Sequence, residues 1–296
     1  MLFRNITVLR ADGTAEDGLT VAVSGGRFAY IGAAAGLPAG DWGETVDGAD
    51  RVLMPGLVNA HTHVAMTLMR GYGEDMPLDR WLFDRIFPFE DKLTGDDVYW
   101  GSLLGIAEML ASGTTSFSDM YYYCDRTVEA VLESGIKANI ARGISCFDET
   151  KRFADLPARA ELAALCGSAH GAGDGRVQID VGPHSEYTTR PDILADVAEF
   201  AAARGLRVQV HVSETRREHL ECVGRHGKTP AAVLRDAGML SLPVTAAHGV
   251  WLTRADMDVF AEYGLTAVHC PQSNLKLGSG IAQVEEWRRR GVSVAL

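Results

Sequence analysis

The chain has 296 residues, of which 47% are hydrophobic, and its formal net charge is −11 from 39 acidic and 28 basic residues. This length and apolar content suffice for one large core, such as an α/β barrel with a small appended unit. The acidic balance argues against binding to nucleic acid or to an anionic membrane, because phosphate groups would be repelled.

The spacing of the cysteines and the absence of long apolar runs indicate the cellular compartment of the protein. The five cysteines are scattered along the chain, and none forms a Cys-x-x-Cys pair, which is typical of reduced thiols in a cytosolic protein. Residues 1–10 contain polar and charged side chains within their apolar run, unlike a signal peptide, and no later run is long enough to span a bilayer. We therefore expect a cytoplasmic protein.

Residues 1–55 differ from the remainder of the chain. Residues 3–8, 19–23 and 28–32 alternate between apolar and polar side chains and are separated by glycine-rich turns, which predicts short β-strands. Such a unit is too thin to form a core of its own. We predict a small, incomplete β domain here.

From residue 56 onward, strand patterns alternate with helical patterns. Helices are predicted over 96–111, 191–204 and 254–263, and the last two are followed by glycine. Eight strands are predicted, over 57–61, 114–119, 137–143, 177–184, 206–213, 243–248, 265–269 and 292–296. This alternation predicts a TIM-type (β/α)8 barrel over 56–296. An open doubly wound sheet is the alternative, but no glycine-rich phosphate loop follows the first strand.

Histidines gather at the carboxyl ends of these strands. His61 and His63 end the first strand, and they point to the same side because side chains alternate along a strand. His211 belongs to the inward-facing set of the fifth strand. Further histidines end the fourth, sixth and seventh strands, at His184, His248 and His269. Single histidines at such positions are usually structural, but six of them at five strand ends favour a metal site.

Three neutral imidazoles can bind a metal ion and leave one coordination position open, as catalytic zinc sites do. The metal would then lower the pKa of water towards neutrality. Glu214 follows the fifth strand and would be within reach to carry protons to a leaving group. His170, His219 and His226 fall in helical or loop segments, and we assign no role to them.

Five motifs in this order resemble the amidohydrolase superfamily. More closely, they resemble the branch of methylthioadenosine and S-adenosylhomocysteine deaminases and their chlorohydrolase-like relatives. The motifs are Pro55-Gly56-Leu57-Val58-Asn59-Ala60-His61-Thr62-His63, Gly182-Pro183-His184-Ser185, His211-Val212-Ser213-Glu214, Ala247-His248-Gly249 and His269-Cys270-Pro271-Gln272-Ser273-Asn274.

The resemblance implies roles for the histidines and for the carboxylate. His61, His63 and His211 would be metal ligands. Glu214 would protonate the purine ring nitrogen and pass the proton to departing ammonia, and His248 would orient or deprotonate the attacking water. His184 stands where binuclear relatives carry a bridging lysine, so the resemblance implies one divalent metal, zinc in the first place and iron or manganese as alternatives.

The resemblance also implies the contacts with the substrate. Trp81 would stack on the purine, Glu90 would bind the ribose and His184 would lie near the sugar. Arg142 would meet the sugar or the 5′ group. The alternatives are a packed core tryptophan for Trp81, a solvated helix-cap glutamate for Glu90 and a surface ion pair for Arg142.

One feature departs from the family pattern. The family's last metal ligand is an aspartate just after the eighth strand, whereas here the eighth strand, 292–296, ends the sequence. The carboxyl-terminal segment that completes the family's small β-sandwich is missing for the same reason. We therefore expect a truncated chain that binds metal weakly or is inactive.

The predicted function is a zinc-dependent hydrolytic deaminase of an adenosine derivative. The partner would be a small nucleoside, without nucleic acid or membrane, and a homo-oligomer is compatible with the sequence. One alternative is a hydrolase of another heteroaromatic substrate, such as guanine, cytosine or a triazine. The other is an inactive fragment that binds a metal or a purine.

Overall fold

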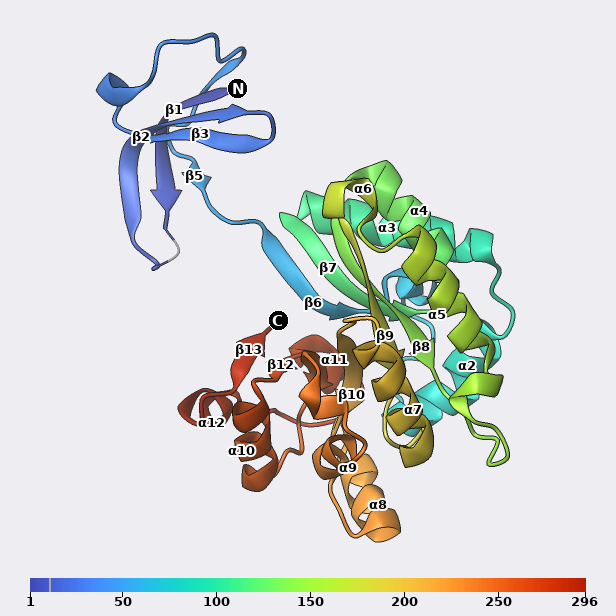
Figure 1. Cartoon of the computed structure of the whole chain (residues 1–296). Coiled ribbons are helices and arrows are strands. Elements are labelled where there is room, and N and C mark those ends of the chain that lie inside the picture. Colours follow the sequence, from blue (N-terminus) through green and yellow to red (C-terminus); the bar gives the residue numbers. More distant parts are fainter. Residues whose placement is uncertain (11) are drawn as a thin grey trace. The chain divides into compact units, whose positions relative to one another are not determined.

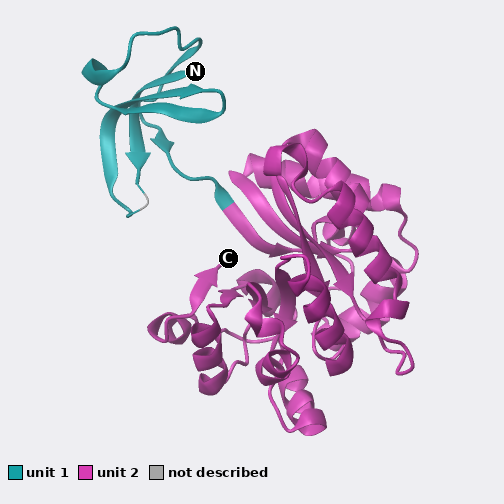
Figure 2. Ribbon diagram, viewed as in Figure 1, with its two compact units in different colours: residues 1–57 teal, residues 58–296 magenta. Residues whose placement is uncertain are grey.

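The structure is a computed structural model that describes residues 1–10 and 12–296. It divides into two compact units, residues 1–57 and residues 58–296, which Figure 1 shows in chain order and Figure 2 colours separately. Within the described residues, no helix has the length and apolar character needed to cross a membrane.

The first unit is a five-stranded sheet in which β1 is central. β1 pairs with β2 in antiparallel and with β4 and β5 in parallel orientation, and β3 pairs with β2. Its small core contains Ile6, Val8 and Val21. The strands are β1 (Leu2–Leu9), β2 (Ala15–Ser24), β3 (Arg27–Gly32), β4 (Thr45–Asp47) and β5 (Val52–Leu53). The alternating pattern predicts the first three, but β4 and β5 are too short to show a pattern.

The second unit is built on an eight-stranded sheet whose neighbours follow chain order from β6 to β13. Its strands are β6 (Leu57–Thr62), β7 (Thr114–Tyr121), β8 (Lys137–Ile144), β9 (Val177–Pro183), β10 (Val208–Val212), β11 (Val244–His248), β12 (Thr266–Val268) and β13 (Ser293–Ala295). The Ala60 amide donates a hydrogen bond of 2.8 Å to the Leu296 carbonyl, which links the first and last strands. The predicted (β/α)8 barrel is therefore confirmed, including all eight strands.

Helices connect these strands. The α-helices are α1 (Leu78–Trp81), α2 (Phe87–Glu90), α3 (Gly95–Ala111), α4 (Cys124–Ser134), α5 (Pro157–Ser168), α6 (Ala172–Gly175), α7 (Pro191–Ala202), α8 (Arg216–His226), α9 (Pro230–Asp236), α10 (Arg254–Tyr263), α11 (Pro271–Lys276) and α12 (Val284–Arg289). Short 3₁₀ turns are η1 (Ala34–Gly36), η2 (Val64–Met69), η4 (Phe153–Asp155) and η5 (Met239–Ser241), and η3 (Leu82–Ile86) is a turn of π-helix.

Capping side chains explain why several of these helices begin where they do. The side chains of Thr94, Thr215 and Thr253 each accept a hydrogen bond from the backbone amide three residues later. The acidic side chain of that later residue in turn accepts a hydrogen bond from the threonine's own amide. This reciprocal arrangement satisfies two amides that the helix itself leaves unpaired. The three helices predicted from the sequence correspond to α3, α7 and α10.

Helix α3 packs closely on η2, the turn that directly follows His63. A Cβ atom on Gly101 would lie 2.6 Å from the Ala65 carbonyl oxygen, and one on Gly105 would lie 2.7 Å from a Val64 methyl group. The Thr67 hydroxyl also donates to the Gly101 carbonyl at 2.7 Å. The two glycines therefore let the helix backbone hold the segment after the histidine pair in place.

We expect Gly101→Ala to destabilise the protein, because the nearest atoms to the new methyl group belong to the backbone and can move only together with η2. Overpacking of this kind costs about 1–3 kcal/mol, or a fall in melting temperature of several degrees. Gly167→Ala is the control, because this exposed helical glycine has open space at its Cβ position and should gain stability. Equal melting temperatures for the two variants would contradict the packing argument.

Candidate active site

Three histidines from two strands converge at one point of the barrel. His61 lies on β6 next to its last residue, Thr62; His63 directly follows β6, and His211 lies on β10. The Nε2 atom of His211 lies 3.2 Å from Nε2 of His61 and 3.3 Å from Nε2 of His63. One ligand atom from each side chain lies within 4.8 Å of the others. Residues separated by almost 150 positions in the chain are thus brought together by strand order alone.

Backbone carbonyl groups fix the orientation of two of these rings. His63 donates from Nδ1 to the Met120 carbonyl at 2.5 Å, and His211 donates from Nδ1 to the His184 carbonyl at 2.6 Å. A carbonyl oxygen only accepts, so the proton resides on Nδ1 and Nε2 presents its lone pair. This is the arrangement by which metal-binding histidines are held in other proteins.

Burial keeps the imidazoles neutral. It lowers the pKa of His63 to about 4 and places the pKa values of His61 and His211 well below the ordinary value of 6.5. Neutral imidazole is the form that binds a metal ion. Lone pairs directed at one buried point repel one another, and a cation at that point relieves the repulsion. The three histidines therefore fit a divalent metal ion.

A cavity of about 320 Å³ surrounds this cluster and collects most of the residues predicted from the sequence. Glu214, His248 and His184 line it together with the three histidines, and so do Trp81 and Glu90. A cavity of this size with a few converging polar groups is typical of a site for a small molecule.

Glu214 is fully buried at the wall of this cavity. Burial raises its pKa to about 8, so its carboxyl group is protonated at neutral pH. Its Oε1 atom lies 3.7 Å from Nδ1 of His248 and 3.5 Å from the Ser279 hydroxyl, which donates to it. A protonated carboxyl group beside a neutral imidazole provides both an acid and a base.

Glu218 holds the loop that carries Glu214. Its carboxylate accepts hydrogen bonds from the amides of Ser213, Glu214 and Thr215, at 2.9, 2.7 and 3.3 Å. These bonds support a turn in which Ser213 has a φ of 49°. The sequence motifs alone do not reveal this role of Glu218, although the pattern Thr215-x-x-Glu218 is the signature of a capping box.

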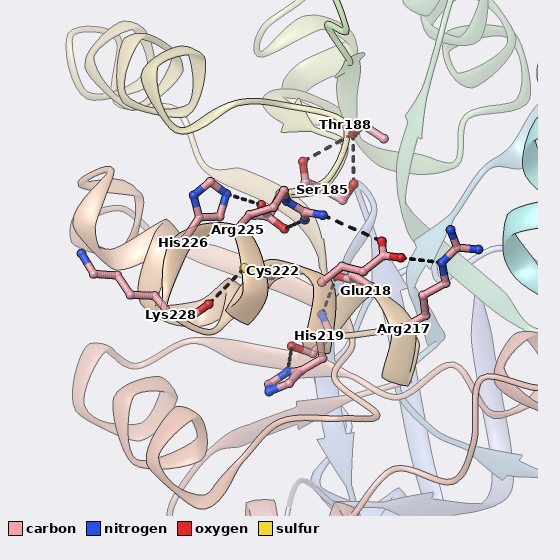
Figure 3. A network of polar contacts seen from close by, with 12 residues as sticks. Ser185, Thr188, Arg217, Glu218, His219, Cys222, Arg225, His226 and Lys228 are labelled. Atoms are coloured by element: carbon pink, nitrogen blue, oxygen red, sulfur yellow. Dashed lines mark hydrogen bonds and ion pairs between the residues drawn. The ribbon is translucent and has the colours of Figure 1, made fainter.

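Helix α8 carries further buried polar contacts, shown in Figure 3. His219 lies 3.0 Å from the Ser213 hydroxyl. Arg225 and His226 both reach the carboxylate of Glu186, at 2.7 and 2.8 Å. Glu186 lies two residues after His184, so this cluster ties α8 to the loop after β9. The histidines without a predicted role on α8 thus serve to join these loops.

His248 and His184 face the cavity with their Nδ1 atoms already engaged. Nδ1 of His248 donates to the side-chain oxygen of buried Asn274 at 2.8 Å. Nδ1 of His184 lies 3.2 Å from the hydroxyl groups of Ser185 and Thr188. Burial lowers the pKa of His248 to about 4 and that of His184 to about 3. Asn274 belongs to the fifth motif, but its role as partner of His248 was not foreseen.

His269 and Arg142 lie outside the wall of this cavity. Among the described residues, His269 is absent from the cavity wall and packs near Trp287, with ring centroids 6.3 Å apart. The neighbouring Cys270 lines the cavity instead. Arg142 lines an adjacent cavity, where it pairs with Glu161 at 2.5 Å. Five of the six strand-end histidines therefore gather at the site.

Trp81 and Glu90 lie on either side of the π-helical turn η3, at the ends of α1 and α2. Both line the cavity, and burial raises the pKa of Glu90 to about 7. Single turns of π-helix occur frequently at functional sites. The loop after the first strand thus delivers an aromatic face and a carboxyl group to the same cavity.

The comparison with known proteins agrees with this geometry. The sequence pattern of the amidohydrolase family matches residues 52–296. The chain belongs to the amidohydrolase family. A relative from Moorella thermoacetica, named 5-methylthioadenosine/S-adenosylhomocysteine deaminase, is 42% identical over 298 residues, which cover 100% of this chain and 68% of the relative.

Two further relatives of this amidohydrolase are informative. A 5′-deoxyadenosine deaminase from Methanothermobacter thermautotrophicus is 44% identical over 261 residues, 88% of this chain and 60% of the relative. The crystal structure of an adenosine deaminase from Xanthomonas campestris with bound zinc superposes with a TM-score of 0.88 at 31% identity. The match covers 99% of this chain and 67% of that structure.

We expect His211→Ala to lose bound metal, because Nε2 of His211 is the atom that approaches both other imidazoles. Loss of a hydrogen-bond partner of a metal ligand already reduces metal affinity by about tenfold to a hundredfold, and loss of the ligand itself should cost at least as much. Metal content per chain after dialysis, measured by atomic emission, checks this. His170→Ala removes a histidine that lies outside the cluster and should retain the metal. Equal metal content in both variants would contradict the assignment.

The raised pKa of Glu90 predicts a pH dependence of stability. The folded state favours the protonated carboxyl group, so its stability contribution is full below about pH 4.5 and is lost as the pH rises towards about 7. Glu90→Gln removes this titration. We expect the variant to melt about 2–5 °C above the parent protein at pH 8 and close to it at pH 4. A difference that is constant between pH 4 and pH 8 would contradict this.

Proposed function

We propose that this amidohydrolase is a metal-dependent deaminase that converts an adenosine derivative into the inosine analogue and ammonia. The observation that carries the proposal is the buried carboxyl group of Glu214, which lines one cavity together with His61, His63, His211 and His248. Hydrolytic deamination requires a proton donor for the ring nitrogen and a base for water, and these residues supply them.

The metal ion would be held by His61, His63 and His211. We propose zinc, as in the related adenosine deaminase structure. When bound, such an ion supplies Lewis acidity, which makes water nucleophilic near neutral pH.

The chain's own residues carry the proton transfers. Glu214 donates its proton to the ring nitrogen next to C6, which makes C6 more electrophilic. Water adds to C6, and His248, neutral because of its burial, takes the proton that water loses. The proton held by His248 then passes to the amino nitrogen, which leaves as ammonia when its bond to C6 breaks. The remaining hydroxyl proton at C6 returns to Glu214 as the 6-oxo group forms, so both residues regain their starting protonation states. The reaction consumes one water and yields the 6-oxo product.

The remaining walls of the cavity suit a nucleoside. Trp81 offers a flat apolar face for a purine, and Glu90 offers a carboxyl group to ribose hydroxyls. Within the part of the chain that the structure describes, the buried Nε1 atom of Trp81 and the hydroxyl of Tyr121 have no hydrogen-bond partner. Both line the cavity, and unsatisfied buried donors are natural contacts for a polar ligand.

The deciding experiment is a screen for ammonia release by the zinc-loaded protein. Adenosine, 5′-deoxyadenosine, 5′-methylthioadenosine and S-adenosylhomocysteine would be compared with guanine, cytosine and a triazine. We expect turnover of one or more adenosine derivatives, which can be monitored through the decrease in adenosine absorbance. Turnover of only the other heteroaromatic compounds, or binding without any turnover, would overturn the proposal.

Glu214→Gln tests the proton donor. The amide cannot give up its proton to the ring nitrogen, so we expect kcat to fall by about 10²–10⁴ while the metal content stays the same. Ser279→Ala is the matched control, because it removes only the weak 3.5 Å bond to Glu214 and should cost far less. Retention of full kcat in Glu214→Gln would show that another residue delivers the proton.

A further inference from the structure

A second cavity, of about 850 Å³, lies beside the cavity that surrounds His61, His63 and His211. Phe87, Glu90 and Tyr122 line both cavities, so the two share part of their walls. We call the second one the tail cavity. Its wall is formed by the ends of β7 and β8 and by helices α2 and α5, all within residues 58–296.

The inference drawn below rests on the proposed function, because the substrate's position determines which group enters the tail cavity. A purine ring over the histidines places its ribose against Glu90, which stands at the shared wall. The 5′ carbon of that ribose then lies at the boundary between the two cavities. The group attached to it extends into the tail cavity, and the wall of this cavity therefore selects the 5′ group.

The tail cavity contains one positive charge, and that charge is already paired. Among its described lining residues, Arg142 is the single basic side chain. Its Nε donates to Glu161 at 2.5 Å, its Nη1 donates to the Gly143 carbonyl, and its Cζ atom lies 5.0 Å from the centre of the Tyr122 ring. With a side-chain exposure of 14%, Arg142 is enclosed by these partners.

The remainder of the wall is acidic or apolar. The carboxyl groups facing it belong to Glu90, Asp91, Asp125 and Glu161, and its apolar surface includes Phe87, Phe147 and Leu165. A carboxylate entering with the 5′ group meets this excess of negative charge. Because Glu161 already offsets the charge of the guanidinium group, a carboxylate that approaches Arg142 loses part of the attraction that a free arginine would offer.

We propose that Glu161 determines specificity: by neutralising Arg142, it favours 5′ groups without a carboxylate over amino-acid tails. The favoured class comprises small, uncharged groups such as methylthio or a plain methyl group. An amino-acid tail, as in S-adenosylhomocysteine, is the disfavoured class, because its carboxylate competes with Glu161 for the same guanidinium group.

The test compares kcat and KM for 5′-methylthioadenosine and S-adenosylhomocysteine in the parent protein and in Glu161→Gln. The parent should prefer 5′-methylthioadenosine. The variant should raise the ratio of kcat/KM for S-adenosylhomocysteine to that for 5′-methylthioadenosine by about fivefold, the range expected for one partly exposed ion pair. The change should come from a lower KM for S-adenosylhomocysteine.

Asp125→Asn is the matched control. Asp125 lines the same cavity and is exposed, but it makes no ion pair with Arg142. Removing its charge should change the ratio by less than about twofold, since solvent screens it. Melting temperatures of both variants confirm that they fold.

The outcomes separate the two proposals. If the parent protein releases ammonia from none of the four adenosine derivatives of the screen, the proposed function fails. If it deaminates one of them but neither 5′-methylthioadenosine nor S-adenosylhomocysteine, the proposed function stands and the role of Glu161 fails. If it deaminates 5′-methylthioadenosine and Glu161→Gln leaves the ratio unchanged, the role of Glu161 fails. A lower ratio in Glu161→Gln would also overturn the inference, because it would mean that Glu161 binds the ammonium group of the amino-acid tail.

Discussion

The arrangement of this site depends on three neutral imidazoles being directed at one buried point. The fold aligns two of these lone pairs, since Nδ1 of His63 donates to a carbonyl of β7 and Nδ1 of His211 donates to the carbonyl of His184, just after β9. Such convergence costs free energy, because polar atoms are desolvated and the lone pairs repel one another. The barrel maintains it because β7, β9 and β10 each pair with a strand on both sides, while β6 pairs with β7 and is bonded to Leu296 through the Ala60 amide.

The same burial that keeps the histidines neutral suits Glu214 and His248 to the roles of acid and base that we propose for them. Removing solvent from Glu214 favours its protonated form, whereas removing solvent from His248 favours its unprotonated form. The two groups therefore hold, at neutral pH, the protonation states that a proton donor and a proton acceptor need. Glu218 and Asn274 keep them in place, and hydrogen bonds from backbone amides compensate for the burial of the Glu218 carboxyl group.

Much of the barrel and of the site could be predicted from the sequence, because both follow short periods. Apolar runs between helical segments identify the strands, and alternation along β6 and β10 places His61 and His211 inside the barrel. The rule weakens one residue beyond a strand end, where a shift by one residue reverses the direction of a side chain. His269 follows β12 and faces Trp287, whereas Cys270 faces the cavity. The left-handed backbone of Ser213 and His248 likewise leaves no trace in the sequence pattern.

Arg142 shows why the substrate selectivity of a site is harder to predict from the sequence than its chemistry. Ligand histidines can be recognised one at a time, because each must be neutral, buried and at a strand end. The effect of an arginine depends on whether a neighbour has already neutralised it, and here that neighbour, Glu161, lies 19 residues away on α5. An unpaired guanidinium group attracts carboxylates, while a paired one adds little charge to the wall around it. The selectivity of the tail cavity is therefore a property of the Arg142–Glu161 pair, which exists only in the folded chain.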